Sequence, residues 1–207
     1  MMRHAKMRLG YRIVGFVVRS FGRLFLGLRV SGVERIPLKG RLLIVSNHVS
    51  SLDPPLIGSV VPREICYVAK IQLFKGLLGK IITYLNAIPI KRSGSDKEAI
   101  QVLSRKLQED KAVLIFPEGT RSHGQEERAP KAGVGLLALM GNSNLLPVCV
   151  EGSDNLKSAF FRKKPLTIKF GQVIQLDSII SEEVSRKDNY SRVAEALMEE
   201  VVHLKSV

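Results

Sequence analysis

The chain has 207 residues, 45% of them hydrophobic, and carries a formal net charge of +13. This length suits one α/β domain with a buried core and is short for two domains, and no repeat or low-complexity segment interrupts the sequence. The positive charge predicts an anionic partner, which could be nucleic acid, a phospholipid surface or an acidic carrier protein.

The basic charge is concentrated at the N-terminus, where residues 1–35 carry eight lysine and arginine side chains against one glutamate. An apolar run over 9–28 predicts a helix, and four arginines project from it within about 60° as one stripe. They are Arg8, Arg12, Arg19 and Arg23. Each arginine would cost roughly 2.5–3.5 kcal/mol at the centre of a bilayer, so a spanning helix is not expected.

The same pattern suits a helix that lies in the membrane interface with its arginines reaching lipid phosphates. The alternative is an ordinary amphipathic helix packed on the domain. A cleaved signal peptide is not expected, because arginines interrupt the apolar region. We therefore predict an amphipathic, membrane-associating segment at 1–28 and a single domain at 29–207.

Beyond this segment, strand and helix patterns alternate, which predicts an α/β fold with a mostly parallel central sheet flanked by helices. The predicted strands are Leu28–Val33, Arg41–Ser46, Glu64–Ala69, Ala87–Ile90, Ala112–Phe116, Leu145–Val150 and Leu166–Ile174. The predicted helices are Pro54–Val61, Phe74–Leu85, Asp96–Gln108, Ala132–Met140 and Asn189–Leu204. A capping box at Ser95 and Glu98 precedes the third of these helices.

Polar residues follow four of the predicted strands. They are His48, Lys70, Arg92 and the run Glu118-Gly119-Thr120-Arg121. Ligands of open α/β sheets collect outside the carboxyl ends of parallel strands. If these four strands are parallel, a histidine and three cationic side chains converge on one edge, and we predict the functional site there.

His48 and Asp53 lie five positions apart in the block Ser46–Pro54. An imidazole can take a proton from a hydroxyl near neutral pH, and a carboxylate beside it holds the ring in one tautomer. No Gly-x-Ser-x-Gly elbow occurs, so the pair is expected to activate a substrate hydroxyl. Asp53 before Pro54 equally suits a helix N-cap, and both roles are compatible because a carboxylate has two oxygens.

The second block, Phe116–Ser122, has the composition of a turn. Its backbone N–H groups, the Thr120 hydroxyl and the Arg121 fork could bind one phosphate, with Glu118 holding Arg121 in place. The alternative is an exposed turn with a solvated arginine, and Arg92 and Lys70 could equally be surface cations.

No metal-ligand spacing is present among the histidines and cysteines, so no metal is predicted. The chain also lacks a P-loop and a Gly-x-Gly-x-x-Gly sequence, which argues against nucleotide binding. Cys66 and Cys149 both lie in apolar runs and are expected to be reduced core residues.

Taken in order, these blocks resemble the motifs of the glycerolipid acyltransferase family. The first motif, Asn-His-x4-Asp, matches Asn47, His48 and Asp53, and the third matches every position from Phe116 to Ser122. The second is similar to Asn86–Arg92, with Asn86 where glycine is usual. The fourth looks like the apolar strand around Pro147. The family's Ala-Lys-x-x-Leu segment matches Ala69, Lys70 and Leu73, and the whole resemblance covers roughly residues 30–175.

The resemblance implies a glycerol-3-phosphate acyltransferase-like fold and a direct acyl transfer. His48, oriented by Asp53, would deprotonate the sn-2 hydroxyl of 1-acylglycerol-3-phosphate, which then attacks an acyl-carrier-protein or acyl-CoA thioester without an acyl-enzyme. The phosphate would be held by the second and third motifs, namely Arg92, Glu118, Gly119, Thr120 and Arg121. Lys70 is a candidate to stabilise the oxyanion. No cofactor is implied beyond the acyl thioester co-substrate.

A peripheral enzyme on the cytoplasmic face of the cell membrane is the expected location, with lysophospholipid, acyl carrier protein and an anionic membrane surface as partners. One alternative is the same chemistry on glycerol-3-phosphate or on a lyso-ornithine lipid. Another class altogether is a basic membrane-binding protein without catalysis. Nucleic acid is not expected, because no recognised binding module appears.

Overall fold

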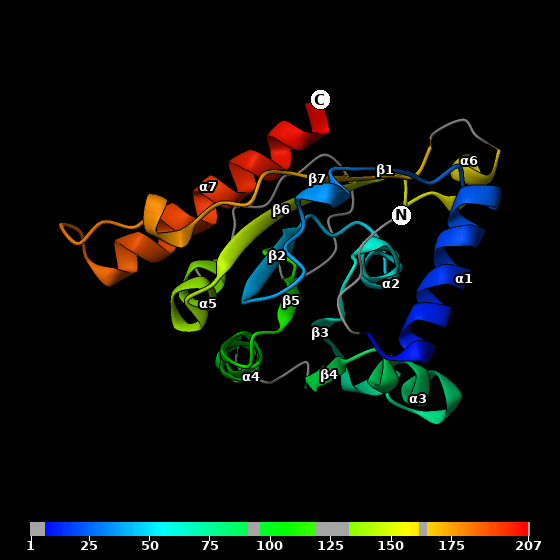
Figure 1. Ribbon diagram of the computed structural model, residues 1–207, viewed down its shortest axis with the longest axis horizontal. Helices are drawn as coiled ribbons and strands as arrows, with labels where there is room; N and C mark the ends of the chain where they lie inside the picture. The colour runs from blue at the N-terminus through cyan, green and yellow to red at the C-terminus, as the bar shows by residue number, and fades with distance from the viewer. Residues whose placement is uncertain (1–6, 91–95, 119–132, 162–164, 207) are drawn as a thin grey trace.

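A seven-stranded sheet forms the centre of the computed structural model, which describes residues 7–90, 96–118, 133–161 and 165–206. The strand order is β1-β7-β6-β2-β5-β3-β4 (Figure 1). The strands are β1 (Arg29–Ser31), β2 (Leu42–Ser46), β3 (Ile65–Lys70), β4 (Ala87–Ile90), β5 (Ala112–Ile115), β6 (Asn144–Glu151) and β7 (Thr167–Phe170).

Seven described α-helices surround this sheet. They are α1 (Leu9–Phe25), α2 (Asp53–Val60), α3 (Gly76–Tyr84), α4 (Asp96–Gln108), α5 (Gly133–Gly141), α6 (Leu156–Phe160) and α7 (Arg186–Ser206). Short 3₁₀ turns lie at Val33–Arg35, Ile71–Leu73 and Leu176–Ser178.

The prediction of a mostly parallel sheet is confirmed. Five of the six strand pairings are parallel, and only β6 and β7 run antiparallel. The five strands from β6 to β4 therefore share one direction, and their carboxyl ends lie along the same edge of the sheet. This is the edge at which the sequence places its polar motifs.

The central strand β2 shows why the sheet needs helices on both faces. Leu42 and Ile44 pack in a core cluster with the α2 side chains, whereas Leu43 and Val45 pack in a second cluster with α4, α5 and α7. Successive residues of a strand point to opposite faces, so a strand that is apolar throughout must be covered twice. All five residues of β2 are buried.

Helix α1 forms an additional layer, because it packs on α2 (Figure 1). Tyr11 of α1 is buried, and its hydroxyl accepts a hydrogen bond from Ile65 N at 3.3 Å. Gly15 lies against α2, where a Cβ would meet the Ser59 backbone at an ordinary contact distance of 3.6 Å. One face of the predicted N-terminal helix is thus packed on the domain.

The predicted elements differ from the observed ones mainly at their ends. The strand predicted at Leu166–Ile174 is shorter, because Gly171 N bonds to Pro147 O and only Ile174 pairs again, as an isolated bridge to Leu145. Helix α6 is not predicted, since five residues carry too little periodicity. The capping box at Ser95 lies outside the described residues, but α4 has the predicted bounds.

Candidate active site

The His48–Asp53 pair is assembled at the carboxyl end of β2. Nδ1 of His48 lies 2.9 Å from Oδ2 of Asp53. The side chain of Asp53 is fully buried, whereas that of His48 is 18% exposed. His48 lies in the loop before α2 and Asp53 is the first residue of that helix, which is how side chains five positions apart meet.

The geometry assigns the two ring nitrogens of His48 different roles. An ionised carboxylate only accepts hydrogen bonds, so the nitrogen that faces Asp53 carries the proton. The other nitrogen, Nε2, has no hydrogen bond from the described part of the chain and can receive a proton from a substrate. The ring also stacks on Phe116, with centroids 4.0 Å apart and planes inclined by 23°.

The carboxylate of Asp53 does not cap α2 in the predicted manner. The N-cap position is Leu52, and Oδ2 of Asp53 turns back to accept from Val49 N at 2.9 Å and Ser50 N at 2.8 Å. Its other oxygen, Oδ1, accepts from the Ser153 hydroxyl at 2.5 Å. The carboxylate organises the loop before the helix, and this loop holds His48.

Asn47 attaches this loop to the neighbouring strand. Its Oδ1 accepts from Val150 N and its Nδ2 donates to Val150 O, each at 2.8 Å. The side-chain amide thereby continues the β2–β6 ladder one step beyond its last residue pair, Ser46 and Val148. The sequence motif identifies Asn47, but only the structure gives it this role.

The start of the predicted phosphate block adjoins the histidine. Phe116 and Glu118 follow β5, and Oε1 of Glu118 accepts a long hydrogen bond of 3.4 Å from His48 N. Glu118 is buried, with 8% of its surface exposed. Gly119, Thr120, Arg121 and Arg92 lie outside the described residues, so their part in phosphate binding stays a prediction.

Two further predicted residues form no hydrogen bond with His48 among the described contacts. Lys70 ends β3 and is exposed, and β5 lies between β3 and the strand that leads to His48. Pro147 is buried within β6 opposite Val45 of β2. Its carbonyl accepts from Gly171 N at 2.9 Å, so Pro147 contributes to the core beside the site.

The four predicted arginines of the N-terminal helix do not share one environment. Arg8 bonds within the domain: its guanidinium contacts Glu64 at 2.8 Å, Tyr84 O at 2.8 Å and Asn86 Oδ1 at 2.6 Å. Arg8 thus attaches the start of α1 to the domain. The basic stripe that the sequence predicts along this helix therefore does not include Arg8. The other three form no ion pair within the described ranges.

Asn86 completes the contact that holds Arg8. Its φ is +63°, in the left-handed region that glycine favours and asparagine tolerates, which explains why it can replace the glycine of the second motif. Its side chain also donates to Glu64 at 3.0 Å. Burial opposes ionisation of Glu64, but the hydrogen bonds from Arg8 and Asn86 outweigh it and hold the pKa of Glu64 below its usual value.

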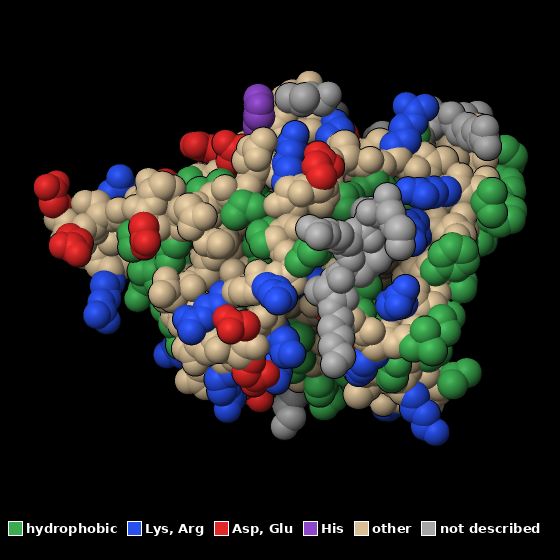
Figure 2. All heavy atoms as spheres, viewed as in Figure 1, with side chains coloured by type: hydrophobic (Ala, Val, Ile, Leu, Met, Phe, Trp, Pro, Cys, Tyr) green, Lys and Arg blue, Asp and Glu red, His purple; other side chains and the backbone are tan. Residues whose placement is uncertain are grey.

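An apolar face of α1 remains uncovered. Its exposed side chains are Leu9, Ile13, Phe16, Val17, Phe21, Leu24 and Phe25. Further exposed apolar residues are Leu77, Leu78 and Ile81 on α3, and Phe160 and Phe161 at the end of α6. Figure 2 shows hydrophobic side chains along the right edge of the molecule, over α1, with lysine and arginine side chains beside them.

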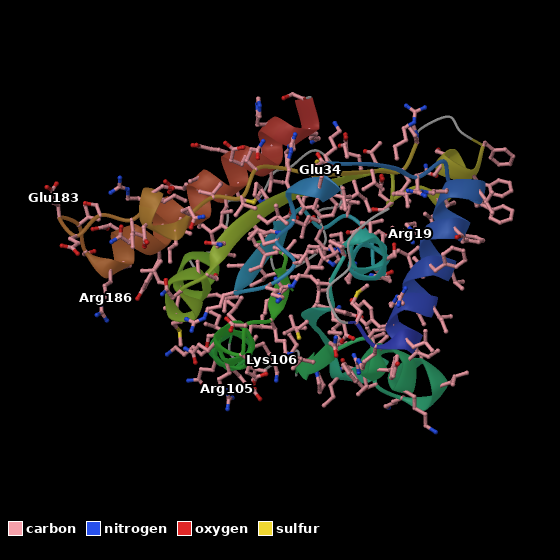
Figure 3. All side chains as sticks on the ribbon, viewed as in Figure 1. Arg19, Glu34, Arg105, Lys106, Glu183 and Arg186 are labelled. Atoms are coloured by element: carbon pink, nitrogen blue, oxygen red, sulfur yellow. The ribbon has the colours of Figure 1, made fainter. Side chains whose placement is uncertain are left out.

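The remaining arginines flank this face. Arg12 and Arg23 are exposed, and Arg19 is half-buried next to α2 (Figure 3). Burial, and then the neighbouring charge of Arg23, lower the pKa of Arg19. None of the described helices is both long and apolar enough to cross a membrane.

The described ranges hold no group of three or more metal-ligating side chains. Both cysteines are free and buried, in agreement with the expected reduced core residues. Ser153 is the principal site contact that the motifs do not indicate. Ser153 lies just beyond the carboxyl end of β6, and this position after a parallel strand is the signal in the sequence that indicates it.

A histidine that bonds to a buried carboxylate at the carboxyl edge of a parallel sheet is an arrangement that can activate a hydroxyl group. Residues 27–151, more than half of the chain, match the family described as Acyltransferase. The protein belongs to this acyltransferase family.

Individual relatives agree with this assignment. The chain is 26% identical over 182 residues to the 1-acyl-sn-glycerol-3-phosphate acyltransferase of Bacillus subtilis (strain 168), with 87% of this chain and 89% of the relative covered. It is 30% identical over 182 residues to 1-acyl-sn-glycerol-3-phosphate acyltransferase beta of Homo sapiens, with 83% and 65% covered.

A solved structure has the same architecture. The crystal structure of the 1-acyl-sn-glycerophosphate (LPA) acyltransferase PlsC from Thermotoga maritima superposes with a TM-score of 0.64 at 25% identity. The match covers 94% of this chain and 83% of that chain. The predicted family and fold are therefore confirmed.

Proposed function

We propose that this protein transfers a fatty acyl group from an acyl-carrier-protein or acyl-CoA thioester to the sn-2 hydroxyl of 1-acylglycerol-3-phosphate, which forms phosphatidic acid. The observation that carries the proposal is the 2.9 Å contact between His48 Nδ1 and Asp53 Oδ2 at the strand-end edge. The family assignment and the names of the relatives support the choice of acceptor.

The chemistry follows from the two ring nitrogens. Nε2 of His48 takes the proton of the acceptor hydroxyl while Asp53 stabilises the imidazolium. The acceptor oxygen bonds to the thioester carbonyl carbon, the carbon–sulfur bond breaks, and the thiolate takes up the proton. Lys70 is the candidate to stabilise the oxyanion. The reaction needs no cofactor in this scheme, because the acyl thioester is a co-substrate.

One assay tests the proposal. The purified protein is incubated with 1-acylglycerol-3-phosphate, glycerol-3-phosphate or a lyso-ornithine lipid, and with each donor in turn, while product formation is followed by mass spectrometry. We expect phosphatidic acid from 1-acylglycerol-3-phosphate. If the acyl group is transferred to the lyso-ornithine lipid alone, the proposed acceptor is wrong although the reaction is right. If no acceptor is acylated, the proposal is overturned in favour of a binding protein without catalysis.

The acceptor phosphate is proposed to bind Arg92 and the run Glu118-Gly119-Thr120-Arg121. Arg121→Ala is expected to raise the KM for the acceptor by about 10–100-fold with a smaller change in kcat, because charge-assisted hydrogen bonds to phosphate are lost. Steady-state kinetics at varied acceptor concentration measures this change. An unchanged KM would exclude Arg121 from phosphate binding.

The lipid substrate gives a reason for the uncovered face of α1. We propose that this face, flanked by Arg12, Arg19 and Arg23, binds an anionic membrane surface, which makes the protein peripheral on the cytoplasmic side of the cell membrane. Arg8 is omitted from this surface, because it bonds to Glu64. Aromatic side chains suit the boundary between headgroups and acyl chains.

The double substitution Phe16→Asp with Phe21→Asp is expected to weaken binding to phosphatidylglycerol-containing vesicles by at least about 10-fold, because each phenylalanine loses roughly 1.5–3 kcal/mol of apolar burial. Vesicle co-sedimentation measures the change. The matched control is Val202→Asp, which places a carboxylate on an exposed apolar position of α7. Equal binding by the double variant and the control would contradict the proposed membrane surface.

A further inference from the structure

Among the described residues, Ser153 is the one side chain outside the recognised motifs that bonds directly to the Asp53 carboxylate. It follows β6, and only 1% of its surface is exposed. Its hydroxyl donates to Asp53 Oδ1 at 2.5 Å across 100 residues of sequence. The bond joins the carboxyl end of β6 to the first residue of α2.

A sharp turn of the backbone at Gly152 places Ser153 beside Asp53. Gly152 has a φ of +78°, in the left-handed region, and turns the chain directly after β6. A Cβ on Gly152 would lie 2.5 Å from Pro165 O, so no other residue fits without moving the neighbouring backbone. This turn brings the Ser153 hydroxyl over the carboxylate.

The two carboxylate oxygens of Asp53 accept different numbers of hydrogen bonds. Oδ2 faces three donors, namely His48 Nδ1, Val49 N and Ser50 N. Within the described ranges, Oδ1 has the Ser153 hydroxyl alone. The terminal torsion of an aspartate is soft, so the plane of the carboxylate is set by its hydrogen bonds. Without Ser153, Oδ1 would be buried and unpaired, which favours rotation of the carboxylate or entry of a water.

We propose that Ser153 is a positioning residue for acyl transfer: its hydroxyl fixes the Asp53 carboxylate so that Oδ2 stays on His48 Nδ1 and Nε2 stays the proton acceptor. Ser153 acts through Asp53 and is one residue removed from the reacting atoms. This inference rests on the proposed function. It predicts an effect on turnover and little effect on the binding of either substrate.

The first test is the substitution Ser153→Ala. We expect kcat to fall by about 10–100-fold, because the carboxylate that orients the base loses a buried hydrogen bond, and both KM values to stay within about twofold. Ser153→Cys keeps a similar volume with a weaker donor and is expected to have intermediate turnover. Ser153→Thr keeps the hydroxyl and is expected to restore turnover above that of the alanine variant.

Ser143→Ala is the matched control. Ser143 precedes β6 at the opposite edge of the sheet and is buried to a similar degree, and its hydroxyl has no hydrogen-bond partner among the residues that the structure describes. Removing it is expected to leave kcat unchanged. Thermal unfolding of all variants separates a loss of folded protein from a loss of turnover.

A double-mutant cycle distinguishes positioning from general support of the fold. Once Asp53→Asn has removed the carboxylate, adding Ser153→Ala should change kcat by less than about twofold, since the two act as a unit. The inference is wrong if Ser153→Ala lowers kcat by the same factor in the wild-type protein and in Asp53→Asn. It is also wrong if kcat of the single variant Ser153→Ala stays within about twofold of wild type. An inactive wild type would instead overturn the proposed function.

A second readout requires no substrate. In protein labelled with ¹⁵N-histidine, the His48 signals, assigned by their absence in His48→Ala, should report the Nδ1–H tautomer. In Ser153→Ala we expect a mixture with the Nε2–H tautomer. An unchanged tautomer in a folded Ser153→Ala protein would contradict the positioning role whichever acceptor the enzyme uses.

Discussion

His48→Ala is expected to lower kcat by about 10²–10⁴-fold, the usual contribution of a general base. The imidazole is 18% exposed, stacks on Phe116 and bonds to Asp53, so it can reach a substrate from a position that is otherwise fixed. The KM for the acceptor should change little, because the phosphate is proposed to bind elsewhere. Steady-state kinetics with 1-acylglycerol-3-phosphate measures both constants.

His203→Ala provides the matched control for this substitution. His203 is exposed on α7, across the sheet from α2, and its removal should leave turnover unchanged. Unfolding temperatures of the two variants should agree within a few degrees. Near-normal acyl transfer by a folded His48→Ala protein would exclude His48 as the base and, with it, the proposed mechanism.

Asp53→Asn is expected to lower kcat by about 10²–10⁴-fold, because the imidazolium loses its stabilising charge. The fold should be retained. An amide can keep its oxygen toward Val49 N and Ser50 N while its nitrogen donates to the Ser153 hydroxyl, which is able to accept. The substitution therefore separates the charge of Asp53 from its hydrogen bonds.

Asp53→Ala tests the structural part of the same carboxylate. It leaves the Val49 and Ser50 amides and the Ser153 hydroxyl without their acceptor, and each unpaired buried group costs about 1–3 kcal/mol. We expect a clear decrease in the free energy of unfolding for Asp53→Ala and a small one for Asp53→Asn, measured by urea denaturation. Full turnover in Asp53→Asn would exclude Asp53 from orienting the base.

The core of the sheet could be predicted because local patterns agree with the tertiary structure there. The run Leu42–Val45 is apolar throughout, which is typical of a strand covered on both faces, and it lies in the central strand β2. The apolar residues of α4 that recur at helical spacing, Ile100, Leu103 and Leu107, are buried. The bounds of β7 were predicted poorly, because the bond between Gly171 and Pro147 depends on a neighbouring strand that the local pattern does not report.

The N-terminal helix shows where a one-dimensional pattern is insufficient. A helical wheel places Arg8 with Arg12, Arg19 and Arg23, since it considers only angles about one axis. The domain supplies Glu64 and Asn86, which bind Arg8 and leave the other three arginines beside the apolar face. Packing on the domain and an uncovered apolar surface are compatible in this helix, because one face packs on α2 while another stays exposed.

The sequence by itself determined the candidate site and the fold class of this protein: the residue types and spacing of Asn47, His48 and Asp53, the block from Phe116, and an alternation that indicates a mostly parallel sheet. These features are local, and short-range spacing together with backbone preference is enough to predict them. The tertiary structure alone decided that Ser153, 100 residues from Asp53, supports the carboxylate and that Arg8 fastens α1 to the domain. Such contacts depend on which strand ends and helices the fold brings together, because hydrogen bonds between distant segments form only after the sheet has set their positions.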